Sequence, residues 1–455
     1  MKPRSVAVIG ASRDPASMGN SVVKSIQDWG FTGDIYPINP KATEILGLKA
    51  YPDIGSVPST IDVASILIPT QFVKGAVEAC ANKGVKGVVI YSAGFAETGE
   101  QGLAAQNEIK ELARERGLRI LGPNINGYFN VPSKLNLTFN QFKYLPGPVS
   151  LVSQSGALAS AIIFRSTHEG IGFNKFIAVG NQADVTEIDA LEYLENDPST
   201  KLIAMYIEGL SDGRRFLSVA KRIVAKKPLI VIKVGIGEAG QRATMSHTAS
   251  IAGSDAIYDA AFKSLGIIRV SGLEELIYTL LTFTTQPIPR GNRVATMTNA
   301  GGLGNIATDS CEKEGLVFPS LTQSTKDEFF KHAPKFASAA NPVDLTGMAD
   351  FKMYKATLTA VLKDENIDSV IVNANKPTFL GIEEFMNAWI ENISVAKELG
   401  KPLLACHVGG SWDDVQKIHS TLRRKGLPAF QAPEIAAKIL SHLVAYGEST
   451  RKKQS

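Results

Sequence analysis

The sequence predicts an α/β protein built from three doubly wound domains, and three observations support this prediction. Short apolar runs such as Val6–Ile9, Val149–Val152 and Val294–Thr298 alternate with amphipathic helical patterns, which is typical of βαβ units and parallel sheets. These runs lack period-2 alternation, as strands do when helices cover both faces of a sheet. Each of the three runs is followed by a Gly-containing turn and a helical pattern, so the same strand–turn–helix sequence occurs three times. We therefore expect three Rossmann-like or flavodoxin-like units.

Two linkers rich in proline and glycine divide the chain, at residues 143–148 and 286–291. They predict domains at 1–145, 146–288 and 289–450. A length of 455 residues agrees with about three domains of roughly 100–200 residues each.

The composition excludes several classes of protein. A net charge of +4 over 455 residues is too small for the basic surface of a nucleic-acid-binding protein. No apolar run is long enough for a transmembrane helix, and the N-terminus lacks the apolar core of a signal peptide. Three widely separated cysteines argue against a disulfide framework and a cysteine-based zinc site. We expect a reduced, cytoplasmic protein without a metal site or a membrane partner.

The first Gly-rich turn resembles a dinucleotide site only in part. Gly10 opens the turn, but Ser12 stands where the G-x-G-x-x-G fingerprint has its second glycine. After the second expected strand Lys41 replaces the acidic residue that would bind an NAD ribose. Arg13 and Lys41 suit a diphosphate or a phosphorylated ribose, although either could be a solvated surface cation. An NAD(P)-dependent oxidoreductase is therefore the weaker alternative.

Five short elements of this segment are similar to the CoA-binding domain of the succinyl-CoA synthetase superfamily. They are Gly10–Ser12, Asn39–Lys41, Ile68–Thr70, Ser92–Phe95 and Gly122–Gly127. The resemblance implies that coenzyme A is bound by Gly10, Ser12, Arg13, Lys41, Pro69, Ser92, Gly94 and Asn124. Glu97 could position a reacting group, or it is a surface glutamate.

The most diagnostic motif surrounds His247, in the run Ser-His-Thr-Ala. Neutral imidazole is a good nucleophile near neutral pH, and the small, polar, Gly-flanked stretch does not look like a packing helix. The stretch resembles the phosphohistidine loop of the NDP-forming acyl-CoA synthetases. This resemblance implies that Glu208 orients the histidine, although Glu208 could also be a plain strand-end residue.

The same resemblance implies phosphate binding at two helix starts. In the second segment these residues are Ser153, Gln154, Ser155 and Gly156, and in the third they are Asn299, Gly301 and Gly302. A helix N-terminus offers backbone N–H groups and a positive dipole end to an anion. Both helices are expected to serve the same phosphate. The roles of Asn181 and Asp184 stay open.

The implied function is that of an alpha subunit of an NDP-forming, and by expectation ADP-forming, acyl-CoA synthetase. Its substrates would be acyl-CoA, phosphate and a small carboxylic acid, with an acyl phosphate and a phosphohistidine as intermediates. The sequence has no P-loop and no room for the ATP-grasp domain that the family uses for nucleotide. We therefore expect Mg-ADP or Mg-ATP to bind at a separate ATP-grasp beta subunit, in an α2β2 assembly. A non-catalytic CoA sensor and a regulatory relative fused to an acetyltransferase are the remaining alternatives.

Overall fold

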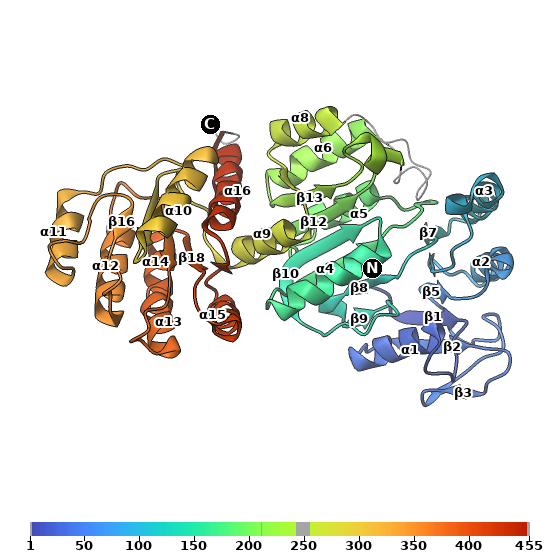
Figure 1. Ribbon diagram of the computed structural model, residues 1–455. Helices are drawn as coiled ribbons and strands as arrows, with labels where there is room; N and C mark the ends of the chain where they lie inside the picture. Colours follow the sequence, from blue (N-terminus) through green and yellow to red (C-terminus); the bar gives the residue numbers. More distant parts are fainter. Residues whose placement is uncertain (1, 211, 243–254, 453–455) are drawn as a thin grey trace. The chain divides into compact units, whose positions relative to one another are not determined.

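The computed structural model describes residues 2–210, 212–242 and 255–452 (Figure 1). The chain forms two compact units, Met1–Ser271 and Gly272–Ser455, and each is described by itself. The first unit contains two large sheets and the second contains one. Parallel strands alternate with helices in all three sheets, so the predicted α/β class with doubly wound sheets is confirmed.

The first sheet has five parallel strands in the order β2-β1-β5-β6-β7. The strands are β1 (Ser5–Ile9), β2 (Asp34–Ile38), β5 (Val63–Ile66), β6 (Gly87–Ile90) and β7 (Arg119–Leu121). The helices are α1 (Met18–Asp28), α2 (Val73–Asn82) and α3 (Glu100–Glu115), with short turns η1 (Thr70–Phe72) and η2 (Ala96–Thr98). A small hairpin, β3 (Glu44–Ile45) with β4 (Leu48–Lys49), follows β2.

The second sheet has the order β14-β13-β12-β10-β11-β8-β9. Its strands are β8 (Tyr128–Asn130), β9 (Leu135–Asn136), β10 (Pro146–Ser153), β11 (Phe173–Ala178), β12 (Leu202–Ile207), β13 (Leu229–Lys233) and β14 (Ile268–Val270). The helical elements are η3 (Val131–Ser133), α4 (Gly156–His168), α5 (Glu187–Glu195), α6 (Gly213–Val224) and α8 (Asp255–Leu265).

The strand β8 pairs antiparallel with β11 in this second sheet, and β9 pairs antiparallel with β8. Both strands lie within the range 1–145 that the sequence predicts for the first domain. Aromatic packing explains the placement, because the ring of Phe129 in β8 lies against Phe173 and Phe176 in β11. The strand β8 thus joins the second sheet, as does β9 after it, whereas β7 before it belongs to the first. The Phe129 ring also lies 5.1 Å from that of Trp29, which follows α1.

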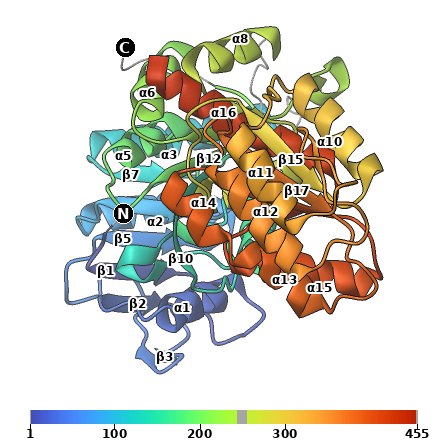
Figure 2. The same ribbon diagram turned by 90° about the vertical axis from the view of Figure 1, so that its left-hand side faces the viewer.

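The third sheet, in the second unit, has five parallel strands in the order β16-β15-β17-β18-β19. They are β15 (Val294–Thr298), β16 (Val343–Asp344), β17 (Ser369–Ala374), β18 (Leu403–His407) and β19 (Ala429–Phe430). The helices are α9 (Leu273–Thr285), α10 (Gly301–Lys313), α11 (Gln323–His332), α12 (Phe351–Lys363), α13 (Ile382–Ile390), α14 (Ile393–Leu399), α15 (Trp412–Arg424) and α16 (Pro433–Lys452). Figure 2 shows α11–α14 from the side that covers one face of this sheet.

Both faces of the third sheet are buried, as its apolar strands predict. One core joins the sheet to α12, α13 and α15, and the other joins it to α9, α10 and α16. None of the helices in the described ranges is long and apolar enough to cross a membrane.

The five parallel strands of each sheet share one order once they are numbered along the chain, with the antiparallel β8 and β9 left aside in the second sheet. The first strand lies between the second and the third, and the fourth and fifth follow beyond the third. In this doubly wound order, ligands bind at the carboxyl ends of the first and third strands, where the strand order reverses. The three switch points are β1 with β5, β10 with β12, and β15 with β17.

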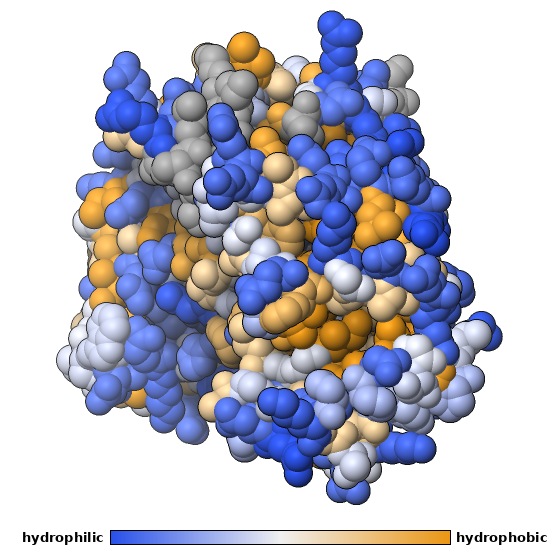
Figure 3. Space-filling view, turned by 90° about the vertical axis from the view of Figure 1, so that its right-hand side faces the viewer, coloured by the Kyte–Doolittle hydropathy of each residue, from blue (hydrophilic) through white to orange (hydrophobic). Residues whose placement is uncertain are grey.

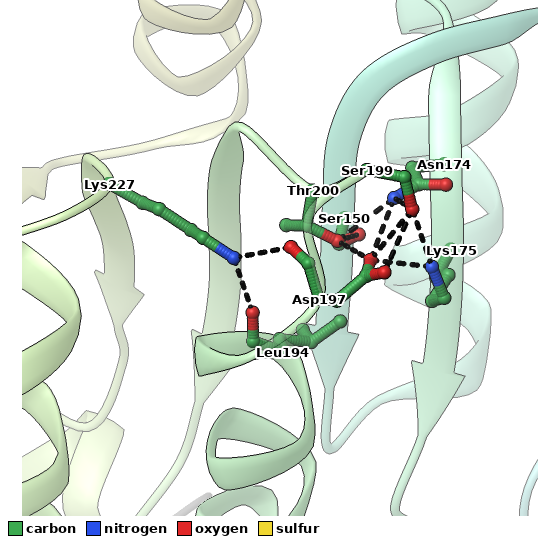
Figure 4. Close-up of polar contacts among 8 residues, drawn as sticks. All are labelled: Ser150, Asn174, Lys175, Leu194, Asp197, Ser199, Thr200 and Lys227. Carbon is green, nitrogen blue, oxygen red and sulfur yellow. Dashed lines mark hydrogen bonds and ion pairs between the residues drawn. The ribbon is translucent and has the colours of Figure 1, made fainter.

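Polar side chains, most of them buried, hold the opposite, amino-terminal edge of the second sheet. We name them the amino-edge cluster: Ser150, Asn174, Lys175, Asp197, Ser199, Thr200 and Lys227 (Figure 4). The Nζ of Lys175 lies 2.5 Å from Asp197 Oδ2, and Lys227 Nζ donates to the Asp197 carbonyl at 2.6 Å. Burial acts to raise the pKa of Asp197, but hydrogen bonds from Lys175, Thr200 and Ser199 hold this pKa below its ordinary value. The cluster therefore stabilises this edge as an ion pair with its hydrogen bonds made.

Candidate functional site

The turn after β1 approaches the switch point of the first sheet closely. Gly10 has a φ of +92°, and a Cβ at this position would lie 2.3 Å from the carbonyl oxygen of Leu67, just beyond β5. A residue with a side chain would therefore be strained here and would clash with backbone.

The helix after this turn does not start at the turn itself. The N–H groups of Gly10 and Ala11 donate to carbonyl groups in β2 and β1, and α1 begins only at Met18. Ser17 caps that helix by accepting from the N–H of Asn20 at 3.1 Å. The N–H groups of Gly10 and Ala11 are therefore not free to bind an anion, because strand carbonyls accept hydrogen bonds from them.

Asn39 joins the loops after β1 and β2. Its Nδ2 donates to the Ala11 carbonyl at 2.7 Å, and its Oδ1 accepts from the N–H of Lys41 at 2.8 Å. The guanidinium of Arg13 donates to the Lys41 carbonyl at 3.1 Å, and both basic side chains are exposed. The structure thus brings Arg13 and Lys41 together beside Ser12.

A cleft of about 320 Å³ opens next to these loops. It is lined by glycine backbone, amide groups and aliphatic side chains, including Gly10, Ser12, Ile38, Asn39, Ile54 and Ile68. Figure 3 views the molecule from the right-hand side of Figure 1, where α2 and α3 lie. Apolar side chains gather in hollows on this face. An apolar floor with cations at the rim suits a ligand that carries both an aromatic ring and phosphate groups.

The remaining predicted coenzyme A residues lie on the loops after β5, β6 and β7. Ser92 Oγ donates to the Ile68 carbonyl at 2.6 Å, and the Ser92 carbonyl accepts from the N–H of Asn124 at 3.0 Å. Asn124 has a φ of +60°, and its Nδ2 donates to Asn181 Oδ1 at 3.3 Å. Pro69 lies exposed at the start of η1. The structure thus connects Ser92 and Asn124 directly.

Glu97 fixes the loop that contains Gly94. Its Oε1 accepts from the N–H of Gly94 at 2.6 Å, and its Oε2 accepts from the N–H of Phe95 and from Asn181 Nδ2. Burial acts to raise the pKa of Glu97, but the hydrogen bonds from Asn181 and Gly94 lower it below the ordinary value. Glu97 is therefore an ionised acceptor that orders a loop, rather than a group that exchanges protons near neutral pH.

Asp184 joins the first sheet to the second and does not belong to this group of loops. Its Oδ2 accepts from Arg119 Nε at 2.7 Å and from the N–H of Ile120 at 2.9 Å, both in β7. These bonds to β7 give Asp184 a structural role.

In the second sheet, Glu208 follows β12 directly at the switch point and is 4% exposed. Gln154, which follows β10, accepts from the N–H of Glu208 at 2.5 Å and donates to the Gly209 carbonyl at 2.8 Å. Its own N–H donates to the Tyr206 carbonyl. Gln154, expected to cradle phosphate, therefore uses its side-chain amide to hold the backbone of Glu208. The carboxylate of Glu208 accepts from the Tyr206 hydroxyl at 3.3 Å.

The start of α4 lies at the same edge. Ser155 is its N-cap and accepts from the N–H of Leu158 at 3.3 Å, and Ser153 Oγ donates to the Ser155 carbonyl at 2.7 Å. Gly156 is the first helical residue. The positive end of the α4 dipole is thus placed at the second switch point, as the sequence predicts.

Three residues at this edge were missed by the sequence analysis: Lys233 at the end of β13, Tyr258 in α8 and Glu187 at the start of α5. The Tyr258 hydroxyl accepts from the N–H of Leu210 at 3.2 Å, and the Lys233 Nζ lies 4.7 Å from the centre of the Tyr258 ring. Together with Gln154 and Glu208 these residues are called the carboxyl-edge cluster. A charged residue closing an apolar strand, as Lys233 does, was the signal available in the sequence.

Glu187 is 1% exposed, and neither of its carboxyl oxygens has a hydrogen-bond partner among the residues that the structure describes. Burial raises the pKa of Glu187 to about 7, although the nearby side-chain amide of Gln154 acts to lower it. The carboxyl-edge cluster thus contains a buried acid that titrates near neutral pH, which is more often found at functional sites than elsewhere.

The third switch point repeats the arrangement of the second. Asn299 follows β15, and its side-chain amide bonds both the carbonyl and the N–H of Asn375 beyond β17, at 2.8 and 3.1 Å. The helix α10 begins at Gly301, and its N-cap Ala300 offers no side-chain cap. The N–H groups of Gly301 and Gly302 therefore lie at a helix start that is open to an anion.

His247 lies outside the described residues. In the parts of the chain that the structure does describe, no group of three or more acidic, histidine or cysteine side chains could hold a metal ion.

Three families match successive parts of the chain. They are described as CoA binding domain over residues 4–128, succinyl-CoA ligase like flavodoxin domain over 146–283 and ligase-CoA domain over 294–448. Each matched range contains the five parallel strands of one sheet, while β9 and most of β8 in the second sheet lie outside the matched ranges.

Whole-chain relatives agree with these families. An acetate–CoA ligase [ADP-forming] II subunit alpha from Pyrococcus furiosus is 43% identical over 97% of this chain and 96% of its own. An acetate–CoA ligase [ADP-forming] from Methanocaldococcus jannaschii is 42% identical over 98% of this chain and 62% of its own. An acetyl-coenzyme A synthetase 1 from Candidatus Korarchaeum cryptofilum, solved with phosphate and ADP, has a TM-score of 0.93 and 38% identity and covers 100% of this chain. These relatives do not favour an oxidoreductase or a CoA sensor. The chain belongs to the family of ADP-forming acyl-CoA synthetases and corresponds to their alpha subunit.

Proposed function

We propose that this protein interconverts acyl-CoA, ADP and phosphate with a carboxylic acid, CoA and ATP. The observation that supports this most is the near full-length similarity to a subunit named for that ligase, together with an acid, Glu208, fixed at the second switch point. Acetyl-CoA is the first substrate to test, because the relatives are named for acetate.

Coenzyme A is proposed to bind at the first-sheet cleft. Arg13 and Lys41 would contact its phosphate groups, and Gly10 and Ser12 would let the ligand approach the backbone. The loops with Pro69, Ser92, Gly94 and Asn124 would hold the remainder of the molecule. The apolar cleft with two cations beside it supports this placement of coenzyme A.

The proposed chemistry proceeds in three transfers. A phosphate oxygen attacks the thioester carbonyl carbon, so that the carbon–sulfur bond breaks and the CoA thiolate takes up a proton. A nitrogen of His247 then attacks the phosphorus of the acyl phosphate and releases the carboxylate. The phosphoryl group finally moves from His247 to ADP, which leaves the histidine neutral.

Glu208 is proposed to orient His247, and a carboxylate partner also raises the basicity of the reacting imidazole nitrogen. The proposed phosphate ligands are the helix start at Ser153, Ser155 and Gly156 and, separately, the helix start at Asn299, Gly301 and Gly302. Gln154 serves in this proposal by holding Glu208.

Nucleotide binding is assigned to a partner. We infer a separate ATP-grasp beta subunit that holds Mg-ADP or Mg-ATP, in an α2β2 assembly, because the P. furiosus relative is named an alpha subunit. The longer M. jannaschii relative, of which this chain covers 62%, fits the same division of labour within one chain. We further propose domain limits of 1–145, 146–288 and 289–450, and a reducing, cytoplasmic location in line with three free, buried cysteines.

The test uses the chain together with its ATP-grasp partner, acetyl-CoA and radiolabelled phosphate. We expect base-stable, acid-labile label on this chain, which ADP removes as ATP forms. The variant His247→Ala should carry no label and make no ATP, while still binding CoA. Equal label on the variant and the parent chain would refute the phosphohistidine, and CoA binding without turnover on any acyl-CoA would favour a CoA sensor.

A further inference from the structure

Lys233 is a buried lysine that the proposed mechanism does not yet use. It is the last residue of β13, and its side chain is 2% exposed. Its Nζ donates to the carbonyl of Val234 and lies over the ring of Tyr258. An ammonium has three N–H donors and is costly to bury without a charge partner. Among the residues that the structure describes, no carboxylate forms an ion pair with it.

The position of Lys233 in the sheet relates it to Glu208. In the parallel pairing of β12 with β13, Lys233 lies opposite Ile207, the residue immediately before Glu208. The charges that act on Lys233 are those of Asp255, Arg269 and Glu208. Asp255 and Asp259 are both bound to Arg269, at 2.5 and 3.3 Å, so Asp255 already has a cation of its own. Glu208 lies at the end of the neighbouring strand, beside Lys233.

Burial works against a charged Lys233. The pKa of Lys233 is lowered, chiefly by burial, while Asp255 and Glu208 act to raise it. A lysine that only supported the fold would gain from a full set of partners, as Lys175 has at the other edge of this sheet. Lys233 instead lies where ligands bind in doubly wound sheets.

We propose that Lys233 is a positioning residue of the phosphoryl-transfer site, whose buried ammonium balances the negative charge of Glu208 and fixes the end of β13 beside it. This inference rests on the proposed function. A fixed positive charge in a site with little water stabilises charge that develops in the reaction, because it needs no rearrangement at that moment. Lys233 acts through Glu208 and through the strand end, not by contact with substrate.

The experiment compares ATP formation by the complete enzyme, chain plus ATP-grasp partner, for the parent chain and for Lys233→Met. We expect kcat to fall by about 10- to 100-fold, as for other residues that orient a reacting group, with little change in the KM for phosphate or CoA. The control is Lys263→Met, which removes an exposed lysine from α8, the helix of Tyr258, and should leave kcat unchanged.

A double-mutant cycle separates positioning from mere support of the fold. Because Lys233 acts through Glu208, Lys233→Met should have less than about a 3-fold effect in a Glu208→Gln background, where there is no charge to balance. If Lys233→Met alone does not fold, the double variant, which lacks both charges, is compared with Glu208→Gln. Independent effects in the cycle, or a kcat for Lys233→Met within 3-fold of the parent, would overturn the inference.

His247→Ala is assayed in parallel. If the parent chain makes ATP and His247→Ala does not, an unaffected Lys233→Met refutes the role of Lys233 alone. If the parent chain makes no ATP from any acyl-CoA, the proposed function and the inference that depends on it both fail.

Discussion

The two edges of the second sheet bury lysines in opposite ways. At the amino-terminal edge, Lys175 is fully buried and contacts Asp197 and Ser199 (Figure 4). At the carboxyl edge, the ammonium of Lys233 contacts one carbonyl group and the face of one aromatic ring. The carboxyl oxygens of nearby Glu187 have no hydrogen-bond partner among the described residues. The same chain can therefore satisfy a buried charge, and it does so away from the switch point. In this sheet, the buried charged groups Lys233 and Glu187 with incomplete pairing lie at the edge where doubly wound sheets bind ligands.

The largest effect should come from breaking the amino-edge pair. Lys175→Met leaves Asp197 buried with hydrogen bonds but no cation, and removal of one partner from a buried pair typically costs about 3–5 kcal/mol. We expect a loss near 3 kcal/mol, because Ser199 and Thr200 still donate to the carboxylate. Urea unfolding of the purified chain measures this loss.

The control for this loss is again Lys263→Met, whose stability should stay within about 0.5 kcal/mol of the parent. In the fraction of Lys175→Met that remains folded, the phosphorylation rate per molecule should equal that of the parent chain. A loss below 1 kcal/mol, or a folded but inactive enzyme, would remove the contrast between the two edges.

The next effect concerns the amide of Gln154. Gln154→Leu removes the acceptor for the N–H groups of Glu208 and Gly209, and a buried donor left without a partner costs about 1–3 kcal/mol. We expect a loss of about 2 kcal/mol and a slower phosphorylation of His247, because Glu208 loses its fixed backbone. Unfolding and label incorporation are measured on the same preparation. An unchanged phosphorylation rate despite lower stability would show that Gln154 supports only the fold.

The arrangement of the sheets followed from the sequence, but the partners within them did not. Apolar runs bounded by turns predicted most of the strands, and three similar openings predicted three doubly wound sheets. The placement of β8 was not predictable, because it depends on aromatic contacts between Phe129 and residues far along the chain. Hydrophobic pattern sets which segments are strands, while side-chain packing decides which sheet a short strand joins.

The candidate site shows the same limit. Gln154 and Asn299 were expected to bind phosphate because they stand at helix starts. The sequence did not show that their side chains also tie the first strand of each sheet to the third, at Glu208 and Asn375. The sequence predicts which residues stand beside a turn. The hydrogen-bond partner of each of their side-chain atoms depends on which strands lie next to each other, and the sequence alone does not show this. Lys233 and Glu187 were missed for the same reason. Their burial results from the packing of β12, β13, α5 and α8, which are separated in the sequence.

The last effect is a pH dependence at Glu187, and it shows whether the carboxyl edge lowers the stability of the folded chain. The pKa of Glu187 is raised to about 7 in the folded chain, from an ordinary value near 4.5. The folded state therefore holds this proton more tightly than the unfolded state does. Stability from this group is present below about pH 4.5 and is lost as the pH rises through about 7.

Glu187→Gln keeps the shape of the side chain and removes its titration. We expect the variant and the parent chain to unfold at similar urea concentrations at pH 5, and the variant to be more stable at pH 8 by about 1–3 kcal/mol. The difference should grow between those pH values, because only the parent chain must ionise a buried carboxyl there. A constant difference from pH 5 to pH 8 would mean that Glu187 finds a partner in solution. The carboxyl edge would then be as fully paired as the amino edge, and incomplete pairing would no longer mark the functional side of the sheet.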